Sequence, residues 1–265
     1  MEASKQTVHF IDKYLLAPTN PVVVTIIGAG GTGSQVLTAL GRINVSLIAL
    51  GHPGIFVRLF DDDLVTTANM GRQLFTTSEL GLSKSVVLIN RVNRFFGTNW
   101  KAFCKKISSR SDKNELRANI IISCVDSIKT RFELASLIKK MDSASQSVNR
   151  PVYWMDFGNS RDSGQVILST IGEVKQPASV KYETNGKLPY LTDEFKDLLK
   201  GQPEDLSPSC SMAEALHKQD LFINTSLSAL GASLLWSMFR EGMIRYRGFF
   251  LNLKDFRTQP IAIEI

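Results

Sequence analysis

Short apolar runs and helix-spaced apolar positions alternate along the first 160 residues of the chain. Residues 21–27, 55–60 and 119–125 are runs rich in β-branched or aromatic side chains, which is typical of strands buried on both faces of a parallel sheet. Residues 34–50 and 83–95 instead carry their apolar side chains at helical spacing. The pattern therefore predicts a strand–helix–strand–helix order, the signature of a doubly wound α/β sheet.

The rest of the chain predicts further strands and helices and one long interruption. Strands are expected at 100–107, 151–157, 165–169, 248–253 and 260–265, and helices at 130–141, 193–200 and 220–240. The helix at 220–240 is expected to bury a seam made of Ile223, Leu227, Leu230, Leu234 and Met238. Residues 173–210 contain four prolines and two glycines, which favours a functional crossing loop inserted in the fold. We expect a single domain over 1–265 with a Rossmann-like, mostly parallel sheet and C-terminal strands.

Composition and charge exclude several classes of protein. The 265 residues are 43% hydrophobic and 21% charged, as in folded proteins, and no run of about 18 apolar residues could span a membrane. Three cysteines cannot build a disulfide framework, and none are spaced as a zinc-binding pair. With no leader-like N-terminus, we expect a cytoplasmic protein. Most of the +6 net charge lies in residues 101–150, which argues against a nucleic-acid-binding protein.

A glycine-rich segment joins the first strand to the first helix. It reads Gly28-Ala29-Gly30-Gly31-Thr32-Gly33, a G-x-G-x-x-G pattern at a strand end. Glycines let the backbone approach an anion, and the free N–H groups of a helix start point at it. The pattern predicts a nucleotide phosphate site, although a tight turn without a ligand would share the same spacing.

Charged residues follow the ends of the next two strands. Three acids, Asp61 to Asp63, come 28 residues after Gly33, whereas a nicotinamide enzyme places one acid about 20 residues on. Arg72 and Lys84 supply cations of the kind that a reaction expelling pyrophosphate requires. Asp126 follows the strand at 119–125, at the sheet edge where ligands bind, and is a candidate Mg²⁺ ligand.

These motifs, taken together and in order, resemble the adenylation domain of the ThiF/MoeB/ubiquitin-activating (E1-like) superfamily. The series is Gly28, Gly30, Gly31, Gly33, Asp61, Asp63, Val65, Asn69, Arg72, Gln73, Lys84 and Asp126. Within the superfamily the chain is similar to the ThiF-like proteins of the bacterial PRTRC gene system, also over residues 208–216.

The resemblance implies a reaction and a role for each motif. ATP would adenylate the C-terminal carboxylate of a ubiquitin-like protein, with the tail threaded under residues 173–210, and the enzyme would be a homodimer. Asp61 would bind the ribose and Asp63 would assist, while Asn69, Arg72 and Lys84 would contact the phosphates with Gln73 beside them. Asp126 would hold Mg²⁺. Gln73 could instead only support Arg72.

Several alternatives stay open at the level of sequence. Cys210 could accept the acyl group as a thioester, since it follows Pro208-Ser209 and begins an apparent helix, or the reaction could stop at the adenylate. The chain could also be an adaptor that binds nucleotide and partner without adenylating. A nicotinamide-dependent oxidoreductase is disfavoured by the acid–Asn–Arg-Gln run. Arg131, Cys104 and Cys124 are interpreted as structural.

One departure from the resemblance concerns a cation. Dimeric relatives contribute an N-terminal arginine to the partner's phosphates, but residues 1–41 contain no arginine, only Lys5 and Lys13. Lys13 could substitute for it as a point charge. Zinc-binding cysteine pairs found in many relatives are absent too, so Mg²⁺ is the only metal expected.

Overall fold

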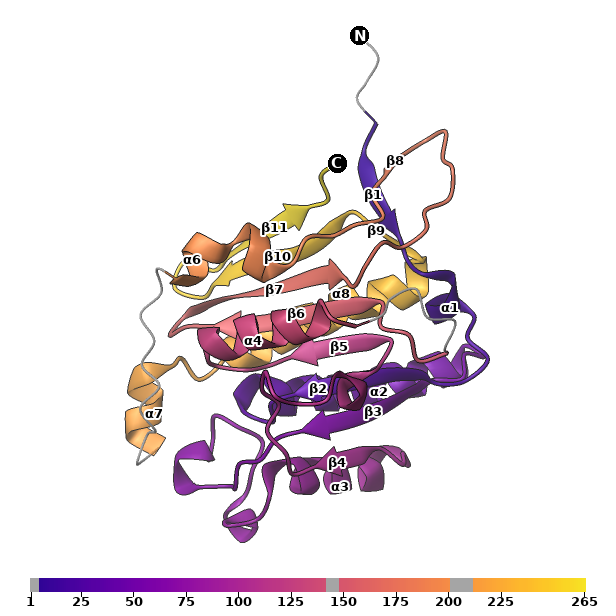
Figure 1. Ribbon diagram of the computed structural model, residues 1–265. Helices are drawn as coiled ribbons and strands as arrows, with labels where there is room; N and C mark the ends of the chain where they lie inside the picture. The colour runs from indigo at the N-terminus through magenta and orange to yellow at the C-terminus, as the bar shows by residue number, and fades with distance from the viewer. Residues whose placement is uncertain (1–4, 142–147, 201–211) are drawn as a thin grey trace.

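Eight strands form one sheet in the order β11-β10-β7-β6-β5-β2-β3-β4 (Figure 1). The computed structural model describes residues 5–141, 148–200 and 212–265. Five neighbouring strands are parallel: β2 (Val22–Ile27), β3 (Ile55–Phe60), β4 (Lys101–Phe103), β5 (Ile120–Ser123) and β6 (Tyr153–Asn159). Antiparallel pairing adds β7 (Ser163–Thr170), β10 (Tyr246–Asn252) and β11 (Arg257–Ala262). The predicted Rossmann-like, mostly parallel α/β fold is confirmed.

Helices cover both faces of this sheet. One face carries α2 (Gly31–Ala49), α3 (Lys84–Phe96) and α8 (Ile223–Glu241), and the other carries α4 (Ile128–Ile138), α5 (Leu191–Glu194) and α6 (Lys196–Lys200) (Figure 1). The chain leaves β2 toward β3 and β4, then returns to place β5 on the other side of β2. The strand order therefore reverses between β2 and β5, and such a point opens a crevice at the carboxyl ends of the strands.

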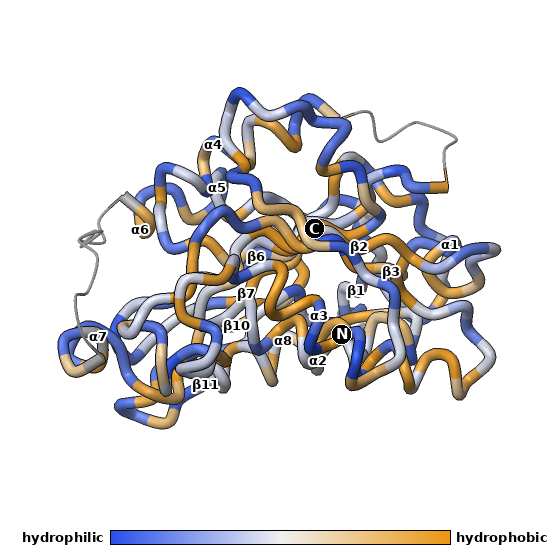
Figure 2. Tube along the Cα trace, turned by 90° about the horizontal axis from the view of Figure 1, so that it is seen from below, coloured by the Kyte–Doolittle hydropathy of each residue, from blue (hydrophilic) through white to orange (hydrophobic). Residues whose placement is uncertain are grey.

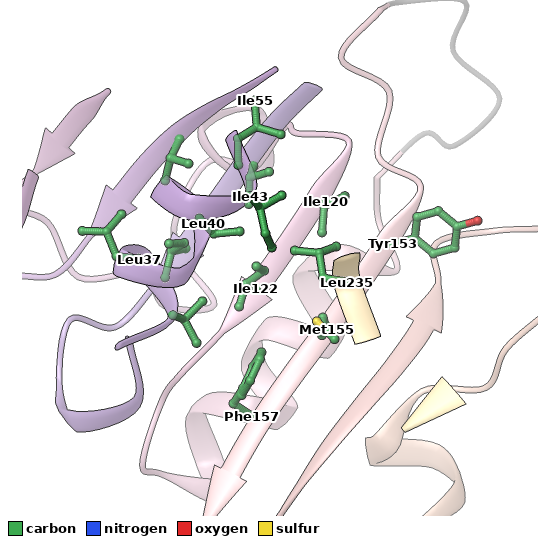
Figure 3. Packing of buried hydrophobic residues seen from close by; sticks show 14 of the residues in the cluster. Leu37, Leu40, Ile43, Ile55, Ile120, Ile122, Tyr153, Met155, Phe157 and Leu235 are labelled. Atoms are coloured by element: carbon green, nitrogen blue, oxygen red, sulfur yellow. The ribbon is translucent and has the colours of Figure 1, made fainter. Parts of the chain in front are cut away.

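Alternate residues of the central strands fill two separate cores. Ile120, Ile122 and Met155 point to the face covered by α2 and α8, where they meet Leu40 and Leu235 (Figure 3). The intervening strand residues, such as Ile121 and Trp154, pack under α4. Burial on both faces explains the continuous apolar runs of the sequence. Figure 2 shows the same arrangement, with hydrophobic residues concentrated in the central strands and hydrophilic residues in the outer loops.

Helix α8 buries Ile223, Leu227 and Met238 as the sequence predicts, but another residue of the predicted seam faces outward. In α8, Leu230 is 40% exposed, while Leu235 and Gly231 are buried. A Cβ on Gly231 would lie 2.3 Å from the Phe157 ring, so this glycine lets α8 lie directly on β6 and turns the buried stripe toward it. In α3, Phe95 is 80% exposed, whereas Phe96 packs against the core beside Gly41 of α2.

A second, smaller sheet forms from short segments that the sequence pattern does not reveal. β1 (Thr7–Phe10) pairs with β8 (Glu183–Thr184) on one side and β9 (Met243–Ile244) on the other. Helices α1 (Lys13–Leu16) and α7 (Met212–Lys218) are similarly short. The predicted crossing loop therefore contains β8, α5 and α6 over residues 173–200, and residues 201–210 lie outside the described residues. No helix in the described part of the chain is long and apolar enough to span a membrane.

A fully buried histidine ties this small sheet to the main one. His9 Nδ1 donates to the Asn185 carbonyl oxygen at 2.7 Å, and its Nε2 accepts from the Tyr153 hydroxyl at 2.8 Å. The Tyr153 oxygen accepts in turn from the Asp12 backbone N–H. Each nitrogen of a neutral imidazole is thus satisfied. Burial lowers the pKa of His9, while the hydrogen bond to the Asn185 carbonyl and the negative charge of Asp12 act to raise it.

This histidine should make the stability of the protein depend on pH. Since its pKa is lower in the folded state, the unfolded chain takes up its proton first, and the contribution of His9 is lost as pH falls below the unfolded value of 6.5. We expect the free energy of unfolding of wild type, measured with urea, to fall between pH 7.5 and 5.0. We expect the His9→Gln variant to be less stable at pH 7.5, and its free energy of unfolding should fall less steeply with decreasing pH. Parallel pH profiles for the two proteins would contradict this role.

Candidate functional site

An open cleft of about 680 Å³ lies at the carboxyl ends of the strands, where the strand order reverses. Its walls come from the glycine loop, the loops after β3 and β5, and the start of α8. Of the predicted site residues, the cleft is lined by Gly28, Gly30, Gly31, Asp61, Asp63, Arg72, Gln73, Lys84 and Asp126. Gly33 and Asn69 are buried and do not line the cleft. Cys210 lies outside the described residues. The sequence motifs therefore converge on one place.

Close approach of the glycine loop to β5 shapes the floor of the cleft. Gly28 has φ +97°, and a Cβ there would lie 2.6 Å from the Cys124 carbonyl oxygen. A Cβ on Gly33 would lie 2.0 Å from the Gly28 oxygen. Both positions thus require glycine. Gly30 differs, because a Cβ there would meet nothing within 4 Å and would project into the cleft. This open space suits a ligand that approaches the backbone.

The N-terminus of α2 opens into the same space. The helix is 19 residues long, begins at Gly31, and no side chain caps its first turn. Its first N–H groups lack helical partners, and the helix dipole adds partial positive charge. Together with the uncovered Gly30, this end of α2 can bind a phosphate group.

Asp61 joins the glycine loop to the loop after β3. Its Oδ2 accepts from the Ala29 N–H at 2.6 Å, and its Oδ1 accepts from the Asp63 N–H at 2.9 Å. Burial raises the pKa of Asp61, while these N–H groups and the Lys84 charge oppose the rise. The carboxylate is therefore fixed at the cleft wall, and its remaining lone pairs can accept hydrogen bonds from hydroxyl groups of a ligand.

Lys84 reaches the cleft from the first turn of α3. The side chain of Lys84 is 8% exposed, and its Nζ lies 2.8 Å from Oδ2 of Asp63, whose side chain is 64% exposed. The Lys84 N–H also donates to the Asp63 carbonyl oxygen, and the Ser85 hydroxyl donates to the Asp61 carbonyl oxygen. These bonds hold the lysine beside the acidic loop, although their partners are 21 to 24 residues apart in sequence.

Asn69 and Gln73, close in sequence, occupy different environments. Asn69 Oδ1 accepts from the Thr66 N–H at 2.8 Å and closes a capping box around the short helix Thr67–Asn69. The Gln73 side chain is 7% exposed and lines the cleft, and its Oε1 is buried without a hydrogen-bond partner. A buried orphan oxygen carries a desolvation cost, which a donor on a bound ligand would relieve.

A polar chain from the C-terminal part of the protein completes the cleft, and the sequence motifs do not reveal it. Arg72 Nη1 donates to Gln219 Oε1 at 2.6 Å, and Asn224 Nδ2 donates to the same oxygen at 2.9 Å. Asn224 Oδ1 accepts from Thr32 and Asn159. The available signal was one amide shortly before α8 and one in its first turn, which is too common a pattern to single out.

Asp126 is the predicted metal ligand. It is exposed at the cleft, just before α4, and no cluster of three or more potential ligands occurs among the described residues. Mg²⁺ is commonly held by one or two carboxylates together with substrate phosphates, so one carboxylate facing a phosphate site fits this metal. Asp126 would hold the ion, which would neutralise phosphate charge.

Arg131 fixes the loop that carries Asp126. Its Nε pairs with Asp156 at 3.1 Å, and its Nη2 donates to the Val125 and Phe157 carbonyl oxygens. Both ionic side chains are at most 4% exposed. Ser123 also donates to Asp156, at 2.5 Å. The structural interpretation of Arg131 thus agrees with its contacts.

Of the remaining lysines considered, some line the cleft and one lies at the other end of the strands. Lys105, Lys106 and Lys129, from the basic block 101–150, line the cleft. Lys13 lies in α1, whose Leu15 contacts the loop before β3, at the amino ends of the strands. Since a six-residue strand is about 20 Å long, Lys13 cannot reach the cleft of its own chain.

The cysteines of the described part also have clear surroundings. Burial raises the pKa of the Cys124 thiol, and nearby Asp156 adds to the rise, so this cysteine at the cleft wall stays protonated. Cys104 is exposed, with its sulfur 3.1 Å from the Ser83 hydroxyl.

Comparisons with known proteins agree on one family. A model described as "ThiF family" matches residues 7–253. Ubiquitin-like modifier-activating enzyme 5 from Xenopus laevis is 25% identical over 166 residues, and the enzyme from Bombyx mori is 27% identical, each match covering 57% of this chain. The chain spans only about a third of the length of these relatives, 37%.

Solved structures share the fold. E. coli MccB aligns with a TM-score of 0.59 at 17% identity, over 94% of this chain and 63% of that chain. PaaA aligns with a TM-score of 0.58 at 15% identity, over 91% and 64%. One of the similar MccB structures contains ATP, with a TM-score of 0.56 at 16% identity, over 94% and 64%.

Removal of Arg131 should test the support under the cleft. The Arg131→Met variant leaves Asp156 as an unpaired buried charge, so we expect the free energy of unfolding in urea to fall by about 3–5 kcal/mol. The matched control is Lys139→Met, which breaks an exposed ion pair with Asp193 and should cost no more than about 1 kcal/mol. Equal losses in the two variants would show that the buried pair has no special role.

Proposed function

Because the chain belongs to the ThiF family, we propose that it activates a carboxylate by ATP-dependent adenylation, releasing pyrophosphate. The observation that carries this proposal is the meeting of an uncapped helix N-terminus, the cations Arg72 and Lys84, and the carboxylate of Asp126 in a single cleft. A nicotinamide enzyme expels no pyrophosphate, so it has no leaving group that Arg72 and Lys84 would stabilise. An enzyme that expels pyrophosphate needs both, because negative charge accumulates on the leaving group.

Each part of the cleft has a place in this reaction. The glycine loop and the α2 N-terminus would bind the triphosphate, and Asp61 would accept from the ribose hydroxyls. One carboxylate oxygen of the substrate attacks the α-phosphorus. The bond from that phosphorus to the bridging oxygen breaks, and pyrophosphate leaves with the electron pair. No proton needs to move, since the attacking carboxylate is already ionised.

Catalysis would then depend on alignment and charge. Arg72 and Lys84 would stabilise the developing pyrophosphate, and a Mg²⁺ ion on Asp126 would supply further positive charge. Cations held at fixed positions in a cleft act more strongly than they would in water, because little reorganisation is needed. Lys105, Lys106 and Lys129 line the same cleft and would attract the anionic nucleotide.

We propose the C-terminal tail of a ubiquitin-like protein as the carboxylate substrate. The name of the relatives, ubiquitin-like modifier-activating enzyme 5, and MccB structures that contain MccA support a protein or peptide substrate. Placement in the bacterial PRTRC system, a homodimer, and a second step on Cys210 remain proposals from sequence resemblance. Lys13 could serve only in such a dimer, from the other copy.

Pyrophosphate exchange tests the adenylation directly. With a ubiquitin-like protein ending in Gly-Gly as substrate, wild type should incorporate labelled pyrophosphate into ATP. Asp126→Ala should abolish the exchange, and Lys84→Ala should reduce it by about 10²-fold or more, since a fixed cation at the leaving group is lost. The control is Lys101→Ala, an exposed lysine at the start of β4, away from the cleft. ATP binding by calorimetry without exchange would instead support the adaptor function.

The thioester step has a separate test. If Cys210 accepts the acyl group, wild type incubated with ATP and the same ubiquitin-like protein should give an adduct on a gel that disappears with dithiothreitol. Cys210→Ala should lose the adduct and keep pyrophosphate exchange. An adduct that persists in Cys210→Ala would remove Cys210 from this role, and Cys104→Ala would then identify the exposed alternative.

A further inference from the structure

Arg72 is held in the cleft by a neutral amide. Its Nη1 donates to Gln219 Oε1 at 2.6 Å, and its Nε is buried without a partner. In the described part of the chain, Gln219 is the only side chain that accepts a hydrogen bond from the Arg72 guanidinium. Gln219 follows α7 directly, far from Arg72 in sequence.

The position of the Gln219 oxygen is itself fixed from two sides. Asn224 Nδ2 donates to it at 2.9 Å, and the Asn224 side chain is in turn held by Thr32 in α2 and Asn159 in β6. Asn224 is only 2% exposed. The backbone N–H of Asp220 also donates to the carbonyl oxygen of Arg161, at 2.7 Å. These hydrogen bonds therefore hold the side-chain oxygen of Gln219 in a fixed position.

Asp126 is the competing partner for this guanidinium. Burial lowers the pKa of Arg72, and the Asp126 charge across the cleft opposes that change, so the two groups attract each other. They nevertheless form no direct ion pair within the residues that the structure describes. A guanidinium–carboxylate pair is geometrically favourable, and its formation would neutralise both groups. Arg72 donates instead to Gln219, which lines the same cleft as Asp126.

We propose that Gln219 is a positioning residue that holds Arg72 away from Asp126, so that the cation stays available to the nucleotide phosphates. A neutral acceptor can do this without cancelling the charge, which a carboxylate at the same position would not allow. The inference rests on the proposed nucleotide-binding function, and it concerns how this chain keeps its cleft ready for an anion.

The test measures ATP binding by calorimetry in EDTA, so that no metal contributes. Gln219→Met has a similar length but no oxygen acceptor, and we expect ATP affinity to fall about tenfold or more, as for loss of a hydrogen bond to a charged group. His217→Ala, an exposed neighbour on α7, is the matched control and should bind ATP like wild type.

Two double variants separate positioning from a general structural effect. In an Asp126→Asn background the competing charge is gone, so Gln219→Met should change ATP affinity by no more than about twofold. In an Arg72→Met background it should have no further effect. Thermal melts check folding, and Gln219→Leu provides a second variant without an acceptor.

The outcomes distinguish the inference from the proposed function. If Gln219→Met and Gln219→Leu bind ATP like wild type, or if the loss is equally large with Asp126→Asn, the positioning role is overturned. If wild type itself does not bind ATP, the proposed function fails and the positioning role fails with it. A loss confined to proteins that keep both Arg72 and Asp126 supports the role.

Discussion

The approach of the glycine loop to the end of β5 is the constraint on which the cleft depends. Gly28 lies against the Cys124 carbonyl, and Gly33 lies against Gly28, so any side chain at either position would push α2 away from the sheet. With α2 in place, Asp61 reaches the Ala29 N–H, and the N-terminus of the helix opens at the point where the strand order reverses. The first turns of α3 and α8 then lie around this fixed turn and bring Lys84 and Asn224 to the cleft.

The cleft keeps its cations charged and still available, in two different ways. Lys84 pairs with an acid that faces solvent, so water screens much of the attraction and a phosphate can compete for the lysine. Arg72 is bound by an amide, which satisfies one N–H without neutralising the guanidinium. By contrast, the fully buried pair of Arg131 and Asp156 neutralises itself, as suits a structural contact under the loop of Asp126. The degree of burial thus separates the structural ion pair from the ionic groups that face the cleft.

The C-terminal part of the chain does more than close the sheet. Helix α8 packs along α2 and the central strands, and its first turn supplies Asn224 to the glycine loop. A Cβ on Gly31 would lie 2.5 Å from the Asn224 amide, so the third glycine of the motif serves the packing of α2 against α8. The small sheet, with buried His9, fixes the start of the predicted crossing loop at the opposite end of the strands. Asn224 of α8 therefore holds the glycine loop at the carboxyl ends of the strands, while residues around Asn185 hold His9 at the amino ends.

The sequence by itself determined the parallel sheet, because strands buried on both faces must be apolar along their length, and it determined which loops carry the phosphate motif, the acids and the cations. The resemblance to a family added their expected roles. Only the tertiary structure decided which of these side chains share the cleft and which support it: Asn69 caps a turn, while Gln73 faces the cleft with an unpaired oxygen. It also decided the burial of single positions in α8, such as Leu230 and Leu235, since helix rotation depends on what the helix packs against. Gln219 and Arg72 are 147 residues apart in sequence. No local sequence pattern predicts their hydrogen bond, because the partner of a single amide is decided only by how the chain folds.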